Sequence, residues 1–357
     1  MLFPYIYVPH KIEKMHGFID FIFYAVWCQA PAKGEFGLAL FEANPDLHGM
    51  MKDFYYDHSK GGDFFYGHVE GIYKLFSKLS PCQTEQFRLW YRGNNDIENI
   101  CANDLLVHAI RYKDLFDKFP ALSKSLATFF RGLYDKSLLG LESVKSRIGD
   151  IKDHNTEFFK KNKVGKCPFC GINDLKGLYH TRRDAYDHYL PKFRYPFNTI
   201  NFRNLAPACH ECNSSYKLSK DPIHIYTGKS VSRRKAFFPY AGAGHSIQIV
   251  VTLRHPNIDA ILPKDITLQF GPTDVNEEID TWKEVYGIEE RYKAKFCGEN
   301  DGKYWLTQVL DEWKWDGRLP DDFMTTLARQ ANDHPFAECR FLKKPFLEAC
   351  QSIGAFP

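Results

Sequence analysis

Apolar residues in the middle of the chain recur at the spacing of an α-helix. The first stripe consists of Leu122, Leu126, Phe129, Phe130 and Leu133. A second stripe runs from Leu138 to Ile151. Intervals of three and four residues place side chains on one face of a helix, so both stripes predict core-facing helices. Ordinary packing explains them, and we assign them no chemistry.

The two ends of the chain give other patterns. The first hundred residues are rich in Phe, Tyr and Gly, and the apolar runs at 18–27 and 36–41 are interpreted as strands. Near the other end, alternating apolar residues at 247–253 and 266–270 predict two further strands. Helical spacing returns at 275–286 and 305–313. The predicted class is therefore α+β.

Length and composition restrict the class of protein further. The 357 residues are 44% hydrophobic and 25% charged, which is typical of a folded chain and excludes a disordered one. The longest apolar run has 11 residues, from Phe18 to Cys28, with Asp20 inside it. A membrane helix needs about 20 residues, so no transmembrane span is expected. Four of the ten cysteines form two Cys-x-x-Cys pairs, which favours metal binding in a reducing cytoplasm over disulfides.

Positive charge is concentrated in one segment. The whole chain has a net charge of only +3, but residues 160–235 contain sixteen Lys or Arg and five acidic residues. The rest of the chain has 31 basic and 39 acidic residues. A basic segment in a mildly acidic protein is expected where phosphates are held, although a solvated basic face is the simpler alternative.

The basic segment contains the two cysteine pairs. They are Cys167-Pro168-Phe169-Cys170 and Cys209-His210-Glu211-Cys212. Two such turns supply the four soft ligands of a tetrahedral structural zinc site. The 38 residues between the pairs exceed the usual zinc-ribbon spacing of about 15 to 20, so this insert is expected to carry a further function.

The insert holds residue types that suit phosphodiester hydrolysis. A neutral His188 can accept a proton from an attacking water. Asp187 and Asn213 offer the oxygen ligands that Mg²⁺ or Mn²⁺ prefers. Neighbouring residues of a strand point to opposite faces, so Asp187 and His188 can act together only on a twisted hairpin or at its rim.

In order and spacing these residues resemble the HNH endonuclease family. The resemblance rests on Asp187-His188 followed by Pro191, on Asn204-Leu205, and on Cys209-x-x-Cys212-Asn213. It covers about a sixth of the chain and implies a ββα-metal fold, with the Asp-His on the first strand. It also implies His188 as general base, Asp187 and Asn213 as ligands of Mg²⁺ or Mn²⁺, and Asn204 as the residue that orients the histidine. The implied domains are a helical N-terminal domain (1–160), an HNH module (161–235) and an α+β C-terminal domain (236–357).

Cations and aromatic residues surround this motif and are predicted to hold the backbone of DNA. The cations are Arg182, Arg183, Lys192, Arg194, Arg203, Lys217 and Lys220. RNA is not excluded as a substrate. A non-catalytic zinc-knuckle module that binds nucleic acid or protein is the alternative function.

An HNH module embedded in a large chain with further domains on both sides resembles the nuclease subunits of prokaryotic antiphage systems, such as the HNH partner of an ATPase in Septu-type defence. That resemblance implies a regulatory protein partner. The net charge of the flanks is near −8, so nucleic acid is expected to avoid them. Aromatic residues are enriched at interfaces, which predicts that a protein docks there, although the same residues can instead fill the cores of the flanks.

Overall fold

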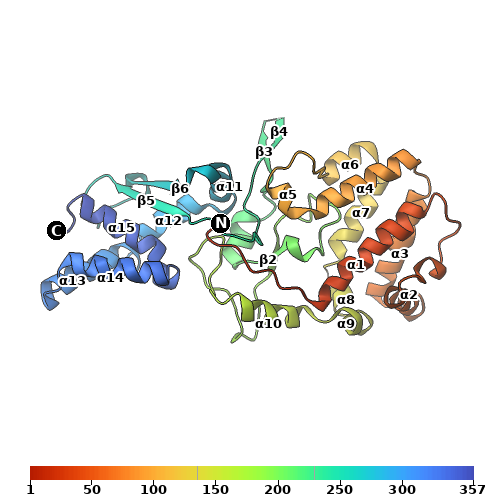
Figure 1. Ribbon diagram of the computed structural model, residues 1–357, viewed down its shortest axis with the longest axis horizontal. Helices are drawn as coiled ribbons and strands as arrows, with labels where there is room; N and C mark the ends of the chain where they lie inside the picture. Colours follow the sequence, from red (N-terminus) through yellow and green to blue (C-terminus); the bar gives the residue numbers. More distant parts are fainter. Residues whose placement is uncertain (135, 229) are drawn as a thin grey trace.

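The chain combines many helices with small antiparallel sheets, as expected for the α+β class. The structure is a computed structural model, and it describes residues 1–134, 136–228 and 230–357. Figure 1 shows an elongated molecule, with N-terminal helices at one end and C-terminal helices at the other. The N-terminus lies near the middle. Among the described residues, no helix is both long and apolar enough to cross a bilayer.

Helices dominate the first 161 residues. They are α1 (Lys14–Phe21), α2 (Pro45–Asp57), α3 (Lys60–Phe76), α4 (Pro81–Asn95), α5 (Ile97–Cys101), α6 (Tyr112–Lys118), α7 (Pro120–Gly132), α8 (Lys136–Leu139), α9 (Glu142–Ile148) and α10 (Ile151–Lys161). The helix predicted from the first apolar stripe is confirmed as α7. The second stripe is divided among α8, α9 and the start of α10, with a left-handed Gly149 (φ +81°) between the last two.

The two strands predicted in the first hundred residues are wrong. Residues 18–27 belong to α1, a π-helix (Ile22–Val26) and the 3₁₀ turn that follows, and residues 38–41 form another 3₁₀ turn. Ile19, Phe23 and Trp27 are fully buried at intervals of four residues. The run is therefore helical. It is apolar on more than one face because other helices cover it on several sides.

Three two-stranded antiparallel sheets are present among the described residues. They pair β1 (Tyr186–His188) with β2 (Leu205–Pro207), β3 (His224–Thr227) with β4 (Ser230–Arg233), and β5 (Gln248–Leu253) with β6 (Ile266–Gly271). The predicted C-terminal strands are confirmed as β5 and β6, in register from Gln248 opposite Gly271 to Leu253 opposite Ile266. The β3–β4 hairpin projects from the centre of the molecule (Figure 1).

Five helices complete the C-terminal part. They are α11 (Asn276–Tyr286), α12 (Ile288–Phe296), α13 (Gly302–Asp316), α14 (Pro320–Asp333) and α15 (Arg340–Ser352). The helices predicted at 275–286 and 305–313 are confirmed as α11 and α13. Helix α15 packs against β5, so this part is a small sheet covered by helices.

The central segment belongs to two hydrophobic cores. Tyr186, Phe202 and Leu205 pack into the core of the N-terminal helices. The four paired cysteines, Phe169 and Tyr189 pack into the core shared with β5, β6 and α11–α15. The β1–β2 hairpin is therefore held from both sides.

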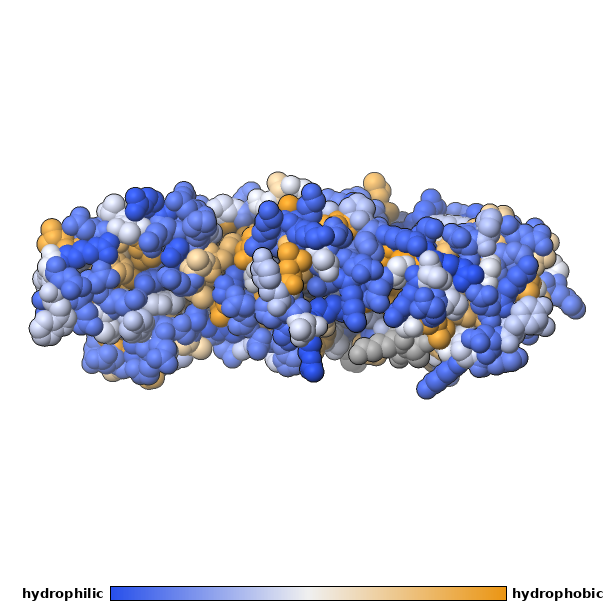
Figure 2. All heavy atoms as spheres, turned by 90° about the horizontal axis from the view of Figure 1, so that it is seen from below, coloured by the Kyte–Doolittle hydropathy of each residue, from blue (hydrophilic) through white to orange (hydrophobic). Residues whose placement is uncertain are grey.

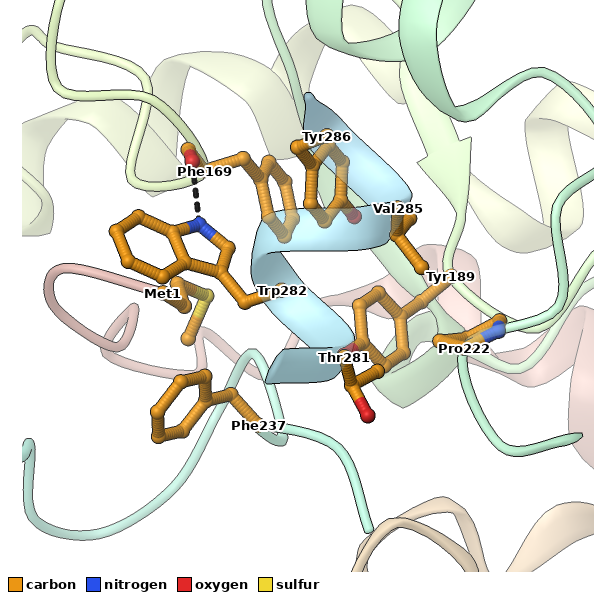
Figure 3. A pocket seen from close by; sticks show the side chains of 9 residues that line it. All are labelled: Met1, Phe169, Tyr189, Pro222, Phe237, Thr281, Trp282, Val285 and Tyr286. Atoms are coloured by element: carbon orange, nitrogen blue, oxygen red, sulfur yellow. Dashed lines mark hydrogen bonds between the residues drawn. The ribbon is translucent and has the colours of Figure 1, made fainter. Parts of the chain in front are cut away.

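Helix α11 makes the tightest aromatic contact with the central segment (Figure 3). The Trp282 indole Nε1 donates a hydrogen bond of 2.6 Å to the carbonyl oxygen of Phe169. The Tyr286 ring stacks on the Phe169 ring, with centroids 4.7 Å apart. Since Phe169 lies between Cys167 and Cys170, these contacts fix the first cysteine turn against the C-terminal part.

Most aromatic residues of the flanks lie inside the two cores rather than on the surface. The face seen in Figure 2 is mainly hydrophilic, with apolar side chains in small, separate groups. Leu105 and Leu106 are adjacent in the sequence and are 79% and 85% exposed. The aromatic content is thus largely explained by core packing.

Burial of His154 makes the stability of the fold depend on pH. This residue of α10 is buried, and its Nδ1 lies 2.7 Å from the Tyr186 hydroxyl. Burial lowers the pKa of His154 to about 4. The unfolded chain, with a histidine pKa of about 6.5, therefore binds the proton first as the pH falls. The contribution of His154 to the free energy of unfolding is therefore complete above about pH 6.5 and is lost progressively as the pH falls to about 4.

We expect His154 to make the free energy of unfolding about 2 kcal/mol smaller at pH 5 than at pH 7. Urea unfolding of the wild type and of His154→Gln at both pH values measures this contribution. The substitution should flatten the pH dependence. His334→Gln, at an exposed position, is the control and should leave the pH dependence as in the wild type. An identical pH dependence in wild type and His154→Gln would contradict the assignment.

Candidate active site and metal centre

A short hairpin and a π-helix carry the candidate catalytic residues. In β1, Asp187 pairs with Ala206 of β2, and His188 pairs with Leu205. The π-helix (Glu211–Lys217) follows β2 after the turn that begins at Cys209. Strand, strand and helix therefore follow one another along the chain.

Asn204 fixes the loop that follows His188. It is fully buried directly before β2. Its side-chain Oδ1 accepts a hydrogen bond of 2.7 Å from the Leu190 amide, and its Nδ2 donates to the carbonyl oxygens of Leu190 and Asn198. These bonds tie Asn204 to Leu190, 14 residues earlier in the chain, and to Asn198, so Asn204 holds the loop rather than touching a substrate.

Asp187 and Lys217 form a buried ion pair. The Lys217 ammonium lies 2.9 Å from Asp187 Oδ1 and donates a second bond of 2.7 Å to the carbonyl oxygen of His188. Burial raises the pKa of Asp187, and the Lys217 charge opposes that rise. Asp187 Oδ2 is buried and has no hydrogen-bond partner. One carboxylate oxygen is thus engaged and the other is left for a further ligand.

The His188 side chain makes different contacts. Its Nε2 lies 3.0 Å from the carbonyl oxygen of Thr199, and its ring meets the Tyr134 ring edge to face at 5.0 Å. A carbonyl oxygen can only accept, so Nε2 carries the proton and Nδ1 keeps its lone pair. Burial, with the charges of Lys192 and Lys217, lowers the pKa of His188 to about 3. The ring is therefore neutral over the working pH range.

Asn213 lies on the π-helix one turn before Lys217. Its backbone amide donates to the carbonyl oxygen of Cys209 at 3.0 Å. Among the described residues, no hydrogen bond to its side-chain amide is found. Because Lys217, four residues later on the same helix, reaches Asp187, we expect the Asn213 side chain to point toward the same strand.

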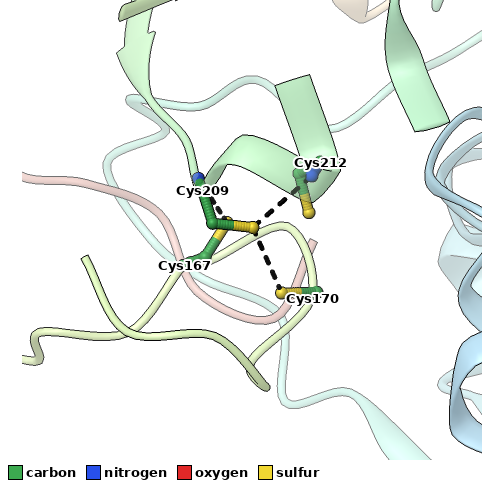
Figure 4. A group of neighbouring side chains, drawn as sticks. All are labelled: Cys167, Cys170, Cys209 and Cys212. Atoms are coloured by element: carbon green, nitrogen blue, oxygen red, sulfur yellow. Dashed lines mark hydrogen bonds between the residues drawn. The ribbon is translucent and has the colours of Figure 1, made fainter. Parts of the chain in front are cut away.

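The four paired cysteines come together as predicted (Figure 4). All four are buried, and their sulfur atoms lie within 4.8 Å of one another. Cys170 Sγ and Cys209 Sγ are 3.9 Å apart. Four sulfurs at about 2.3 Å from a tetrahedral zinc ion lie roughly 3.8 Å from one another. The cluster fits a zinc ion, which would be held by Cys167, Cys170, Cys209 and Cys212.

Polar groups around the cluster favour the thiolate forms that a metal needs. The Arg291 guanidinium of α12 donates to Cys212 Sγ at 3.1 Å, and the Asn173 amide donates to Cys209 Sγ at 3.4 Å. Hydrogen bonds from neighbouring thiols, Cys167 first, lower the pKa of Cys170, and the Arg291 charge adds to this effect. Metal binding requires deprotonated thiols, so these donors support the site.

Three of the predicted nucleic-acid contacts lie around β1 and β2. Arg182 is exposed, and Arg183 stacks on the Tyr186 ring at 5.4 Å. Arg203 is exposed beside Glu98, with 3.5 Å between the charged groups. Arg182 is thus the most available of the three for a phosphate.

Two further cations follow His188 in sequence. Lys192 lies over the Tyr134 ring at 6.0 Å. Arg194 donates to the carbonyl oxygen of Ser219 at 2.7 Å and to the Tyr226 hydroxyl at 3.1 Å. These hydrogen bonds hold the guanidinium in one orientation.

Of the two remaining cations, Lys217 is buried rather than on the exposed, DNA-facing surface predicted for it. Lys217 is only 1% exposed, because the buried carboxylate of Asp187 attracts its ammonium. Lys220 is exposed, but its ammonium donates to the carbonyl oxygen of Glu284 at 3.2 Å. The charge of Lys217 is therefore directed into the site.

An open cavity of about 790 Å³ adjoins the site. Tyr134, which contacts His188, forms part of its wall. Its basic lining residues are Lys145, Lys152, His180, Arg182 and Arg183. Asp150 and Asp184 also line it, but each is paired with a lysine, at 3.3 and 3.7 Å. The cavity is thus suited to an anionic ligand.

Comparisons of the chain with protein-family models, curated proteins and solved structures found no match.

Sequence reasoning missed three residues that shape the site. Tyr134 contacts His188 from beyond α7, Thr199 fixes its tautomer through a backbone carbonyl, and Arg291 reaches Cys212 from α12. A backbone carbonyl carries no sequence signal. The other two residues lie far from the motif in the sequence, so no local pattern could have identified them.

Substitution of Cys212 tests the metal centre. We expect Cys212→Ser to lower the zinc content and the melting temperature, because structural zinc contributes folding energy directly. Cys297→Ser, at a half-buried position outside the cluster, should retain the metal. Mass spectrometry of the metal and a thermal melt measure both effects. A Cys212→Ser variant with wild-type zinc content and stability would show that the four-sulfur site is wrong.

Substitutions of Asp187 and Lys217 should have effects on stability that do not add, because the two side chains form a buried ion pair. Lys217→Met leaves a buried carboxylate without its cation and should cost about 3–5 kcal/mol of unfolding free energy. The double substitution Asp187→Asn/Lys217→Met should recover much of this loss. Lys78→Met, at an exposed lysine, serves as the control and should change little. Equal, small effects of Lys217→Met and Lys78→Met in urea unfolding would contradict the buried pair.

Proposed function

We propose that this chain is a metal-dependent endonuclease of the HNH type that hydrolyses phosphodiester bonds of DNA. The observation that carries the proposal is the hydrogen bonding of the two ring nitrogens of His188. Its Nε2 proton is engaged by the Thr199 carbonyl, and among the described residues no partner is found for its Nδ1, which can therefore accept a proton. The preceding residue of the strand, Asp187, has one carboxylate oxygen without a partner. This combination suits water activation next to a cation.

In this proposal His188 Nδ1 takes the proton of the attacking water. A pKa near 3 makes the free imidazole a weak base, and part of that lowering comes from the charges of Lys192 and Lys217. A bound phosphodiester anion would offset these charges and raise the pKa toward its ordinary value. Substrate binding would thus strengthen the base where it is needed.

Mg²⁺ or Mn²⁺ would be held by Asp187 Oδ2 and the side-chain oxygen of Asn213. The donor set fits a hard cation, because Oδ2 is buried without a partner and an amide oxygen is neutral. Such an ion, when bound, stabilises negative charge on the phosphate and on the leaving oxygen. Asn204 contributes by holding the loop behind His188.

The basic residues around the site would hold the DNA backbone. The cavity lined by Arg182, Arg183 and Lys152 lies next to Tyr134 and hence next to His188. Phosphate contacts of this kind position a nucleic acid without reading its sequence. DNA is the proposed substrate, and a matched RNA is the natural comparison in any assay.

The proposed setting is cytoplasmic antiphage defence with a regulatory partner such as an ATPase subunit. The domains proposed from the sequence are residues 1–160 for partner binding, 161–235 for the nuclease module and 236–357 for the C-terminal domain. The exposed pair Leu105 and Leu106 supports a docking surface in the first of these. A partner retained with the chain during purification from its native host would support this setting.

A second function has one observation in its favour. The Lys217 ammonium already neutralises Asp187, which weakens the attraction for a divalent cation. A non-catalytic zinc module that binds nucleic acid or protein would need no second metal, and the ion pair would then serve folding alone. The two functions differ in whether the chain cleaves nucleic acid.

His188→Ala tests the catalytic proposal. The wild type should nick supercoiled plasmid in Mg²⁺ or Mn²⁺ and should lose this activity when the divalent ion is chelated. His188→Ala should reduce the rate by about 10² to 10⁴, the usual cost of losing a general base, with zinc content and fold retained. His245→Ala, an exposed histidine, should cleave like the wild type. Full cleavage by His188→Ala would exclude its role as base.

Asn213→Ala tests the divalent site separately from the base. Loss of one oxygen ligand should raise the Mg²⁺ concentration required for half-maximal cleavage, while saturating Mn²⁺ restores part of the rate. Ser214→Ala, the next position on the same helix, is an exposed control. An unchanged metal requirement in Asn213→Ala would remove Asn213 from the proposed ligand set.

A further inference from the structure

A second open cavity, of about 480 Å³, lies beside the β3–β4 hairpin, near the turn that joins the two strands. Arg194, Phe193 and Tyr226 line it from the central segment, and Arg111 and Lys113 line it from the start of α6. The last two belong to the N-terminal flank, which nucleic acid was expected to avoid on grounds of net charge. The charge at this cavity therefore differs in sign from the net charge of the flanks.

The cavity carries fixed positive charge. Arg194 is oriented by its bonds to the Ser219 carbonyl and to the Tyr226 hydroxyl. Arg111 is held by two bonds to Asp114, of 2.7 and 2.8 Å, so its charge is largely compensated. Lys113 is exposed, and the structure gives its ammonium no partner among the described residues. Lys113 and Arg194 are thus the cations best placed for phosphate groups.

Two aromatic rings are exposed at the same cavity. Phe193 is 59% exposed, and Tyr226 is 44% exposed with its hydroxyl donating to Asp221 at 3.0 Å. A phenyl ring offers no hydrogen bond, and the Arg131 guanidinium and the Lys192 ammonium already lie over the Phe193 ring, at 5.3 and 5.8 Å. The exposed part of the ring can therefore contribute to binding through apolar and stacking contact. The faces of nucleic-acid bases provide such contact, but in a duplex they are covered by their neighbours.

The cavity is connected to the proposed base through a short series of contacts. Lys192 lies between the Phe193 ring at 5.8 Å and the Tyr134 ring at 6.0 Å, and Tyr134 contacts His188. Asn204 fixes the loop that leads from His188 to these residues. A strand bound in the cavity would therefore lie only a few side chains away from His188.

We propose that this cavity binds unpaired nucleotides of a DNA strand, with phosphates at Lys113 and Arg194 and a base against Phe193. The inference rests on the proposed function, and it narrows the substrate to DNA with an unpaired segment next to the cut. A single strand, a flap or an opened duplex offers both the phosphates and the free base faces.

Binding is measured with the His188→Ala chain, so that cleavage does not interfere. Fluorescence anisotropy compares a short labelled single strand with the blunt duplex of the same sequence, without added divalent ion. We expect the single strand to bind more tightly. Phe193→Ala should weaken single-strand binding about tenfold and leave duplex binding nearly unchanged. Tyr56→Ala, an exposed ring in the N-terminal helices, is the matched control and should change neither.

The salt dependence tests the phosphate contact. Lys113→Ala should reduce the slope of log Kd against log salt by about 0.7 for the single strand, which corresponds to one phosphate contact. Lys78→Ala should leave the slope unchanged. Equal affinity for single strand and duplex, or an unaltered single-strand affinity in Phe193→Ala, would overturn the inference. Failure of the proposed function appears separately, as absence of divalent-dependent cleavage by the wild type.

Discussion

The four-cysteine cluster is the constraint on which the rest of the centre depends. It joins two turns that are separated by 38 residues, and the second turn leads directly into the π-helix. That helix carries Asn213 and Lys217, and the first turn is fixed by Trp282 of α11. Loss of the cluster would therefore release both the helix that faces Asp187 and the docking of the C-terminal part.

Burial of the ion pair within this frame has a clear physical consequence. Two charges removed from water are costly unless each finds a partner, and Asp187 and Lys217 satisfy each other only in part. The second carboxylate oxygen is unpaired. His188, the next residue, faces away toward Thr199, because neighbouring side chains of a strand point to opposite sides. The strand thus separates the proposed base from the proposed metal ligand, and a substrate at its rim can meet both.

Local patterns predicted the parts of this molecule that depend on short-range order. The stripe at 122–133 identified α7, alternation identified β5 and β6, and the Cys-x-x-Cys spacing identified the sulfur cluster. Residues 18–27 were misread, because a helix buried on several sides has the same apolar density as a buried strand. Burial of Lys217 and the contact of Arg291 with Cys212 depend on tertiary packing, which no local pattern records.

X-ray diffraction from crystals soaked in Mn²⁺, recorded at the zinc and manganese absorption edges, tests whether two metals occupy two distinct sites. We expect a zinc peak among the sulfurs of Cys167, Cys170, Cys209 and Cys212. We expect a manganese peak beside Asp187 Oδ2 and the Asn213 side chain. Metal at the cysteines alone, with nothing bound at Asp187 in the presence of DNA and Mn²⁺, would contradict this expectation.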